Sequence, residues 1–166
     1  MSATNSLHYE LCKLGAKLIR SRKNPTIPYN RPCKYSTVEL VCSGTELTDV
    51  WGTTGDSSVI IEVKTSRSDF LADKRKYARS QVAKELDHQI GNYRYYLCPD
   101  GVITEDELPE NWGLLVYDGK AIRKVKMATR VHSSSSLELM HMTSVMSRIL
   151  KPQTFNFREK TEIKFV

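Results

Sequence analysis

Apolar residues near the N-terminus recur at the spacing of an amphipathic helix. Four leucines form this pattern: Leu7, Leu11, Leu14 and Leu18. Residues three or four positions apart share one face of a helix, and Asn5 or Ser6 can cap the first turn. We therefore expect a helix that runs to about Arg20, then a loop broken by prolines and a first strand from Tyr35 to Cys42.

The strongest strand signal lies between Ser57 and Lys64. Its apolar residues, Val59 to Ile61 and Val63, are mostly β-branched, as is typical of a strand buried on both faces of a sheet. Strand side chains alternate between faces, so Glu62 and Lys64 share one face. A carboxylate and an ammonium in such a strand are costly unless each has a partner, so this pair indicates a functional site.

The rest of the pattern predicts further helices and strands. Ser66 or Ser68 can cap a helix that ends near Gly91. Three more strands and a final helix are expected at 93–98, 112–117, 121–127 and 137–149. This order predicts an α/β fold with a mixed central β-sheet flanked by helices. We expect one core domain over 1–132, with a C-terminal helix and tail over 133–166 packed on the same domain.

A second carboxylate, Asp49, lies on a short apolar segment upstream of the central strand. Thr53 to Asp56 is a turn that would fold this segment back along the strand and place Asp49 opposite Glu62. Two carboxylates, waters and a phosphate oxygen make the octahedral oxygen shell that Mg²⁺ prefers. Lys64 would then orient or deprotonate the water that attacks the phosphate.

Asp49 followed by Glu62-Val63-Lys64 resembles the motif of the PD-(D/E)xK nuclease superfamily, although Thr48 stands where the motif has proline. The resemblance implies a restriction-endonuclease-like α/β/α core and metal-dependent hydrolysis of DNA phosphodiesters. It also implies that Asp49, Glu62 and the Val63 carbonyl hold Mg²⁺ or Mn²⁺, with Lys64 beside the attacking water.

The resemblance extends past the motif in both directions. The continuation from Lys64 to Lys74 is similar to the small MmcB-like DNA-repair branch of the superfamily, which implies a repair, recombination or mobile-element setting. Members often place an acidic residue on the first helix, and Glu10 matches that position. The resemblance therefore adds Glu10 to the catalytic candidates.

Glu-x-Lys alone is a common pattern, and the chain contains two similar ones. Glu162-x-Lys164 has no hairpin carboxylate before it, and Asp118-x-Lys120 fits a turn between two strands. The buried strand and the hairpin carboxylate single out Glu62. An ordinary ion pair on an exposed strand remains the alternative for this residue.

The net charge of +6 and the sequence pI near 9.1 suit a polyanionic partner. We expect the partner to be DNA, contacted by six basic residues: Arg31, Lys34, Arg67, Lys74, Arg75 and Lys76. A solvated surface is the alternative for each of them. A non-catalytic DNA-binding or partner-binding protein that retains the nuclease fold is the alternative for the whole chain.

The cysteines, the histidines and the hydropathy predict no disulfide, no zinc site and no membrane span. The four cysteines are scattered without a Cys-x-x-Cys pair, and the four histidines form no ligand cluster in the sequence, so reduced buried thiols are expected. No apolar run approaches the ~18 residues of a membrane span, and no leader pattern precedes the first helix. We expect a cytoplasmic protein, and the sequence is also compatible with a homodimer.

Overall fold

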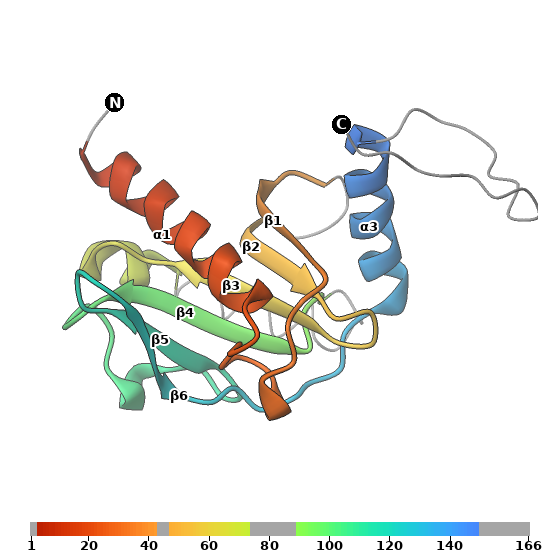
Figure 1. Ribbon diagram of the computed structural model, residues 1–166. Coiled ribbons are helices and arrows are strands. Elements are labelled where there is room, and N and C mark those ends of the chain that lie inside the picture. Colours follow the sequence, from red (N-terminus) through yellow and green to blue (C-terminus); the bar gives the residue numbers. More distant parts are fainter. Residues whose placement is uncertain (1–2, 43–46, 74–88, 150–166) are drawn as a thin grey trace, which may run out of the picture.

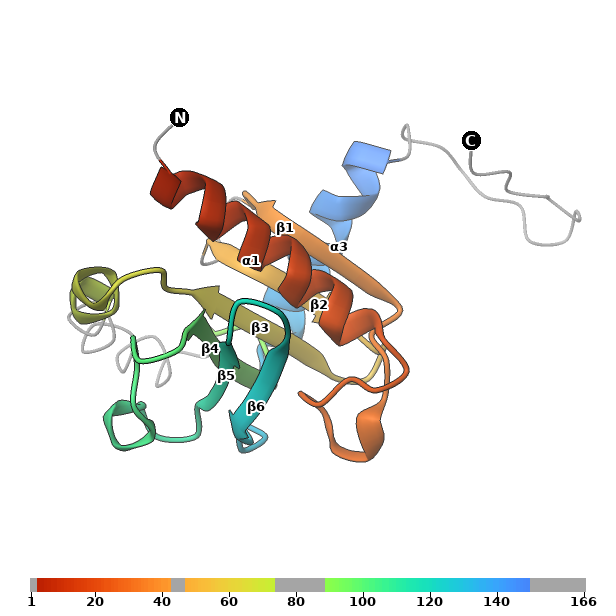
Figure 2. The same cartoon turned by 60° about the vertical axis from the view of Figure 1, so that its left-hand side comes forward.

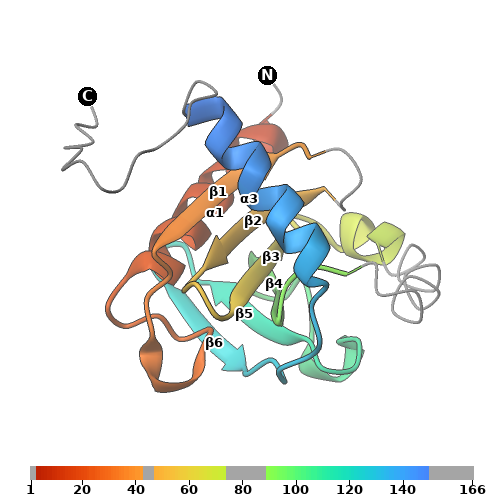
Figure 3. The same cartoon turned by 90° about the vertical axis from the view of Figure 1, so that its right-hand side faces the viewer.

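A six-stranded mixed β-sheet forms the centre of the protein, with helices on both faces (Figure 1). The computed structural model describes residues 3–42, 47–73 and 89–149. The strands follow one another across the sheet in sequence order: β1 (Tyr35–Leu40), β2 (Thr48–Thr53), β3 (Ser58–Val63), β4 (Tyr93–Pro99), β5 (Gly113–Tyr117) and β6 (Ile122–Lys126). Helix α1 (Ala3–Arg20) covers one face and α3 (Ser135–Ile149) covers the other (Figures 2 and 3). The predicted α/β fold with a mixed sheet is confirmed.

Strand directions explain the connections. β1 to β3 form an antiparallel meander, β3 to β5 run parallel, and β6 returns antiparallel to β5. Parallel neighbours need a crossover, and the helical residues 67–73 begin the one from β3 to β4. Ser66 caps this helix, since its Oγ accepts a hydrogen bond of 3.2 Å from the Asp69 amide. The predicted continuation of the helix through 74–88 lies outside the described residues.

Two short 3₁₀ helices, η1 (Pro28–Asn30) and η2 (Glu105–Glu107), lie in the loops. Thr104 and Glu107 form a capping box at η2, which their spacing in the sequence predicts. Across residues 3–42, 47–73 and 89–149, no helix is long and apolar enough to cross a membrane.

β3 is buried on both faces, as its apolar run predicts. Val59, Ile61 and Val63 pack in the core beneath α1, whereas Ile60 packs against Trp51 in a cluster beneath α3. These four apolar residues of β3 are all fully buried. The strand therefore contributes to the hydrophobic layers on both sides of the sheet.

α1 packs directly on β2 because Gly52 leaves room for it. A Cβ atom on Gly52 would lie 2.5 Å from Ile19 Cδ1 and 3.0 Å from the carbonyl oxygen of Tyr35. Ile19 is fully buried at this contact and Leu11 is fully buried in the same core, against which the other three leucines of the predicted stripe are partly buried. The buried face of α1 is thus the leucine face that the sequence predicts.

Glu138 fixes α3 to the sheet through a cluster of donors. Its carboxylate accepts hydrogen bonds from Trp51 Nε1 at 3.0 Å, the Gly91 amide at 2.8 Å and Ser133 Oγ at 2.6 Å. The Ser58 hydroxyl donates to the same carboxylate. α3 is therefore attached to β2 and β3 by charge-assisted hydrogen bonds as well as by packing.

His141 is the fully buried residue of α3, and its ring packs on Trp51 with centroids 4.6 Å apart. Neither ring nitrogen has a hydrogen-bond partner among the described residues. Burial lowers the pKa of His141 below its ordinary value of 6.5. The folded protein thus holds this histidine neutral.

We expect His141 to make stability depend on pH. Because its folded pKa is lowered, the unfolded chain takes up a proton first, and the free energy of unfolding decreases as the pH falls below about 6.5. His141→Phe should reduce this decrease, measured by urea unfolding at about pH 7.5 and about pH 5.5. Leu139→Phe, at an exposed position of the same helix, removes no titratable group and should leave the pH dependence as in the wild type. An unchanged slope in His141→Phe would contradict the assignment.

Candidate active site

The ends of β2 and β3 bring Asp49 and Glu62 together. The strand register pairs Val50 with Ile61, and its continuation by one residue places Asp49 opposite Glu62. Asp49 Oδ2 also accepts a hydrogen bond of 2.7 Å from the Val63 amide. The carboxylate is therefore held against the backbone of the strand that carries Glu62, as the hairpin in the sequence predicts.

Lys64 follows the last residue of β3, and its side chain is only 9% exposed. Its amide donates to the Leu97 carbonyl at 3.0 Å, so this part of the chain still follows β4. Lys64 Nζ lies 3.5 Å from Glu62 Oε2 and 3.4 Å from Asp73 Oδ1. The ammonium is thus shared between two carboxylates. The sequence predicts only one of these partners, Glu62.

Asp73 forms an ion pair with Lys64 and is itself held by a hydrogen bond from Tyr96. Asp73 belongs to the helical segment 67–73, and its Oδ2 accepts a hydrogen bond of 2.8 Å from the Tyr96 hydroxyl. Burial and the neighbouring carboxylate raise the pKa of Tyr96, so its hydroxyl stays protonated and acts as the donor. The stretch from Lys64 to Lys74 that resembles the DNA-repair branch contains Asp73, but its spacing does not assign Asp73 as a partner of Lys64. No motif points to Tyr96, which reaches Asp73 from β4.

The electrostatics of Lys64 decide which chemistry it can perform. Burial by itself would lower the pKa of Lys64, but the charges of Glu62 and Asp73 outweigh it, and the pKa lies above the ordinary value of 10.5. The side chain is an ammonium that can donate hydrogen bonds. Of the two roles that the sequence left open, orienting the water is favoured over deprotonating it.

His8, rather than Glu10, is the α1 residue that approaches the site. His8 Nε2 lies 3.4 Å from Asp49 Oδ2, and Nδ1 lies 3.5 Å from Glu39 Oε1. Glu10 is exposed, because two residues along a helix turn a side chain by roughly 200°. The expectation that Glu10 faces the site is therefore corrected in favour of His8.

The structure places one histidine in a group of side chains that could hold a metal ion, which the sequence does not predict. His8, Cys12 and Asp49 each offer a ligand atom, and these atoms lie within 4.8 Å of one another. His8 and Cys12 are four residues apart, a spacing that places both on one side of a helix. That spacing was visible in the sequence, but the proximity of Asp49 was not.

Glu39 completes the ring of acidic groups at this end of the sheet. It has a φ of 47° inside β1, a backbone conformation that is uncommon for a residue with a side chain. Burial, followed by the charges of Asp49, Glu39 and Glu62, raises the pKa of Cys12 to about 12. All four cysteines are buried thiols, as expected, and Cys12 experiences the negative potential of the site.

The predicted metal ligands fit a hard divalent cation. Asp49 and Glu62 lie directly opposite in the antiparallel pair, where Cβ atoms are about 4.5–5.5 Å apart. Carboxylates carried by Cβ atoms this close can both reach one ion, and the remaining positions suit water or phosphate oxygens, as Mg²⁺ and Mn²⁺ prefer. Val63 lies between Glu62 and Lys64 in the chain, with its amide fixed by Asp49.

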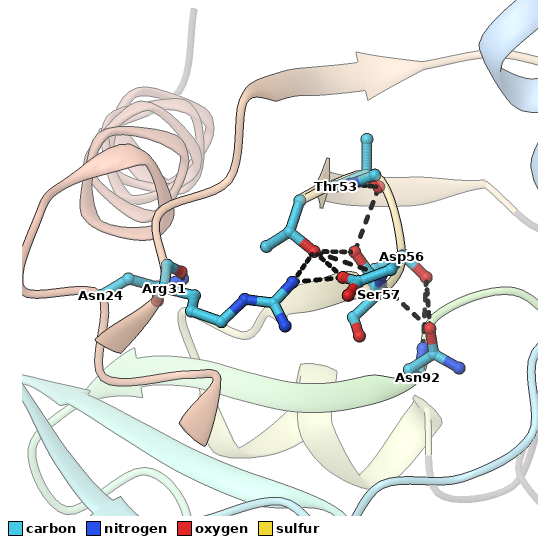
Figure 4. A network of polar contacts seen from close by, with 9 residues as sticks. Asn24, Arg31, Thr53, Asp56, Ser57 and Asn92 are labelled. Atoms are coloured by element: carbon cyan, nitrogen blue, oxygen red, sulfur yellow. Dashed lines mark hydrogen bonds and ion pairs between the residues drawn. The ribbon is translucent and has the colours of Figure 1, made fainter. Parts of the chain in front are cut away.

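Of the predicted nucleic-acid contacts that the structure describes, Arg31 and Lys34 lie apart from Arg67. Arg31 donates hydrogen bonds to Asp56 and Thr54 at the turn between β2 and β3 (Figure 4). In the same network, Thr54 donates to the Ser57 carbonyl and Asn92 accepts from the Ser58 amide. This turn is at the opposite end of the hairpin from Asp49, about 20 Å away for a strand of this length. Lys34 is exposed near the same turn.

Arg67 lies closer to the site, three residues after Lys64. Its guanidinium makes a two-pronged contact with Glu107, so this charge is already paired. Lys74, Arg75 and Lys76 lie outside the described residues, directly after Asp73 in the chain.

Comparisons with known proteins bear on the fold. No protein-family model matches the chain, and no curated protein matches it. Among solved structures, the chain is similar to SPO1766, a protein of unknown function from Silicibacter pomeroyi, with a TM-score of 0.52 and 23% sequence identity. The similarity covers 68% of this chain and 72% of that chain. At this identity the comparison supports the fold alone.

We expect Lys64→Met to destabilise the protein, since it leaves Glu62 and Asp73 facing each other without a cation. The loss should be roughly 2–3 kcal/mol by urea unfolding at neutral pH, below the value for a fully buried pair because Asp73 is partly exposed. Adding Asp73→Asn to Lys64→Met should recover part of the loss.

The control for this prediction is Lys120→Met, which removes an exposed ammonium from the turn of the Asp118-x-Lys120 pattern. Its effect should stay within about 0.5 kcal/mol. Equal effects of the two lysine substitutions would show that Lys64 is no more than a surface charge.

Proposed function

We propose that the protein is a metal-dependent deoxyribonuclease of the PD-(D/E)xK type. The observation that carries the proposal is the meeting of Asp49, Glu62 and Lys64 at the ends of β2 and β3, with the Asp49 carboxylate bonded to the Val63 amide and Lys64 Nζ 3.5 Å from Glu62. Two carboxylates and a buried ammonium at one strand end are an arrangement that phosphodiester hydrolysis needs and that a hydrophobic core does not.

In the proposed mechanism, Asp49 and Glu62 would hold Mg²⁺ or Mn²⁺, and the bound ion would supply Lewis-acid activation of the phosphate and of a nucleophilic water. Lys64 donates a hydrogen bond to that water and orients it for in-line attack. Asp73, fixed by Tyr96, keeps the ammonium of Lys64 in place. His8 positions Asp49 from the α1 side.

A non-catalytic DNA-binding protein with the same fold is the alternative. A binding module would gain nothing from Asp49, Glu62 and Glu39 at a surface that faces a polyanion, because these carboxylates repel phosphates. Their juxtaposition with Lys64 therefore favours catalysis over binding alone.

We expect cleavage to require a divalent cation. Purified protein incubated with labelled linear, circular, single-stranded and branched DNA should cut at least one of these substrates with Mg²⁺ or Mn²⁺, and none of them with excess chelator, because the carboxylates need the ion to approach phosphate. Cleavage at full rate in chelator would rule out this mechanism.

Glu62→Gln and Lys64→Ala should each lower the cleavage rate about 10²- to 10⁴-fold, since one removes a charged ligand and the other removes the group that orients the water. The matched control is the double substitution Glu162→Gln and Lys164→Ala in the second Glu-x-Lys pattern, which lies outside the described residues. It should cleave at the wild-type rate. Full activity in folded Glu62→Gln would place the catalytic centre elsewhere.

Charge reversal of Lys74, Arg75 and Lys76 should weaken DNA binding and reduce its salt dependence, by about 0.9 in the log–log slope for each phosphate that the protein no longer neutralises. These residues directly follow Asp73 and are the predicted basic residues nearest to it in sequence. The comparison is a variant with three charges reversed on the hairpin of the edge strand β6: Lys120, Arg123 and Lys124. A binding slope unaffected by the first set would show that those charges are only solvated.

A further inference from the structure

The α1 side of Asp49 carries a second group of metal-ligating atoms. His8 Nε2 lies 3.4 Å from Asp49 Oδ2, and Cys12 Sγ lies 3.7 Å from His8 Nδ1. All three ligand atoms fall within 4.8 Å of one another. Metal–ligand bonds of zinc imply separations of about 3.3–3.8 Å between ligand atoms in a tetrahedral site. Because only one ring nitrogen of His8 can bind the ion, side-chain rotation must close separations of up to 4.8 Å to bring the three atoms onto it.

The scaffold holds these side chains in place. His8 and Cys12 are one helical turn apart on α1, and Cys12 is fully buried in the core between that helix and the sheet. Asp49 is fixed independently by the Val63 amide at 2.7 Å. One turn of a packed helix and one strand end thus supply all three side chains.

The surroundings favour a cation at this point. Asp49, Glu39 and Glu62 all act electrostatically on the Cys12 thiol, so the negative potential is concentrated where the sulfur lies. A cation that binds here replaces the thiol proton, which passes to solvent, and neutralises part of this charge. If Nε2 of His8 binds the ion beside Asp49, Nδ1 faces Glu39 at 3.5 Å, the carboxylate that would accept the remaining ring N–H.

We propose that His8, Cys12 and Asp49 form a binding site for a transition-metal ion of the Zn²⁺ class. A nitrogen, a sulfur and an oxygen ligand match the preference of Zn²⁺ and its neighbours, whereas Mg²⁺ takes oxygen ligands and does not favour a thiolate. Three protein ligands leave a fourth position for water or a phosphate oxygen. The site shares Asp49 with the Asp49–Glu62 pair and differs from it in its other ligands.

Sharing Asp49 has a consequence that rests on the proposed nuclease function. An ion on the His8 side withdraws Asp49 from the ion on the Glu62 side, so Zn²⁺ competes with Mg²⁺ and inhibits cleavage. Binding at the His8 side itself is independent of whether the protein cuts DNA.

The test uses the full-length protein freed of metal by chelation and dialysis, with Co²⁺ as the spectroscopic probe. The wild type should bind one equivalent and develop the charge-transfer absorption of a Co²⁺–thiolate bond, which Zn²⁺ then removes by displacement. Cys12→Ser and Cys12→Ala should abolish the band. His8→Asn, at a partly exposed position, should weaken Co²⁺ binding about tenfold or more.

Matched variants separate this site from its neighbours. Cys33→Ser alters another buried cysteine and should keep the band, and Glu62→Gln should keep it while losing Mg²⁺-dependent cleavage. Circular dichroism and thermal unfolding confirm that each variant is folded. Absence of the band in the wild type, or its persistence in folded Cys12→Ala, would overturn the proposed site, while a band without any cleavage in Mg²⁺ would overturn the nuclease alone.

Discussion

The structure depends on a central strand that is buried on both faces and still ends in charged residues. Val59 to Ile61 and Val63 bury β3 beneath α1 on one side and beneath α3 on the other. Glu62 and Lys64 lie where this cover ends, too enclosed to be fully hydrated and too polar to join the core. Charges in that position require partners, and the neighbouring elements supply them.

Each partner comes from a different element. β2 supplies Asp49 through the antiparallel register, the helical segment 67–73 supplies Asp73, and β4 supplies Tyr96. The ammonium of Lys64 therefore lies between the carboxylates of Glu62 and Asp73, and their negative charges keep it protonated. An ammonium held in this way is suited to orienting a nucleophile, and the adjacent carboxylates are suited to holding a cation.

The acidic end of β2 and β3 also faces α1, where the donors are of another kind. His8 and Cys12 present nitrogen and sulfur to the same Asp49 that faces Glu62 on β3. In the two proposed sites Asp49 belongs both to the oxygen ligands with Glu62 and to the mixed ligands with His8 and Cys12, so the geometry of this one residue would decide which metal ion binds.

The amino-acid sequence determined the main elements by itself, because their apolar patterns are local. The leucine stripe of α1, the β-branched run of β3, the turn that pairs Asp49 with Glu62 and the Ser66 cap all follow from spacing along the chain. These features need no knowledge of distant contacts, and the α/β fold with a mixed sheet follows from their order.

Only the tertiary structure decided which polar groups from distant segments meet. The packing of α1 on the sheet, with Ile19 against Gly52, brings His8 rather than Glu10 to Asp49. The helical segment 67–73 brings Asp73 to Lys64 and to Tyr96 of β4, and the docking of α3 buries His141 on Trp51. Such contacts depend on packing angles between elements, which helix and strand periodicity do not specify.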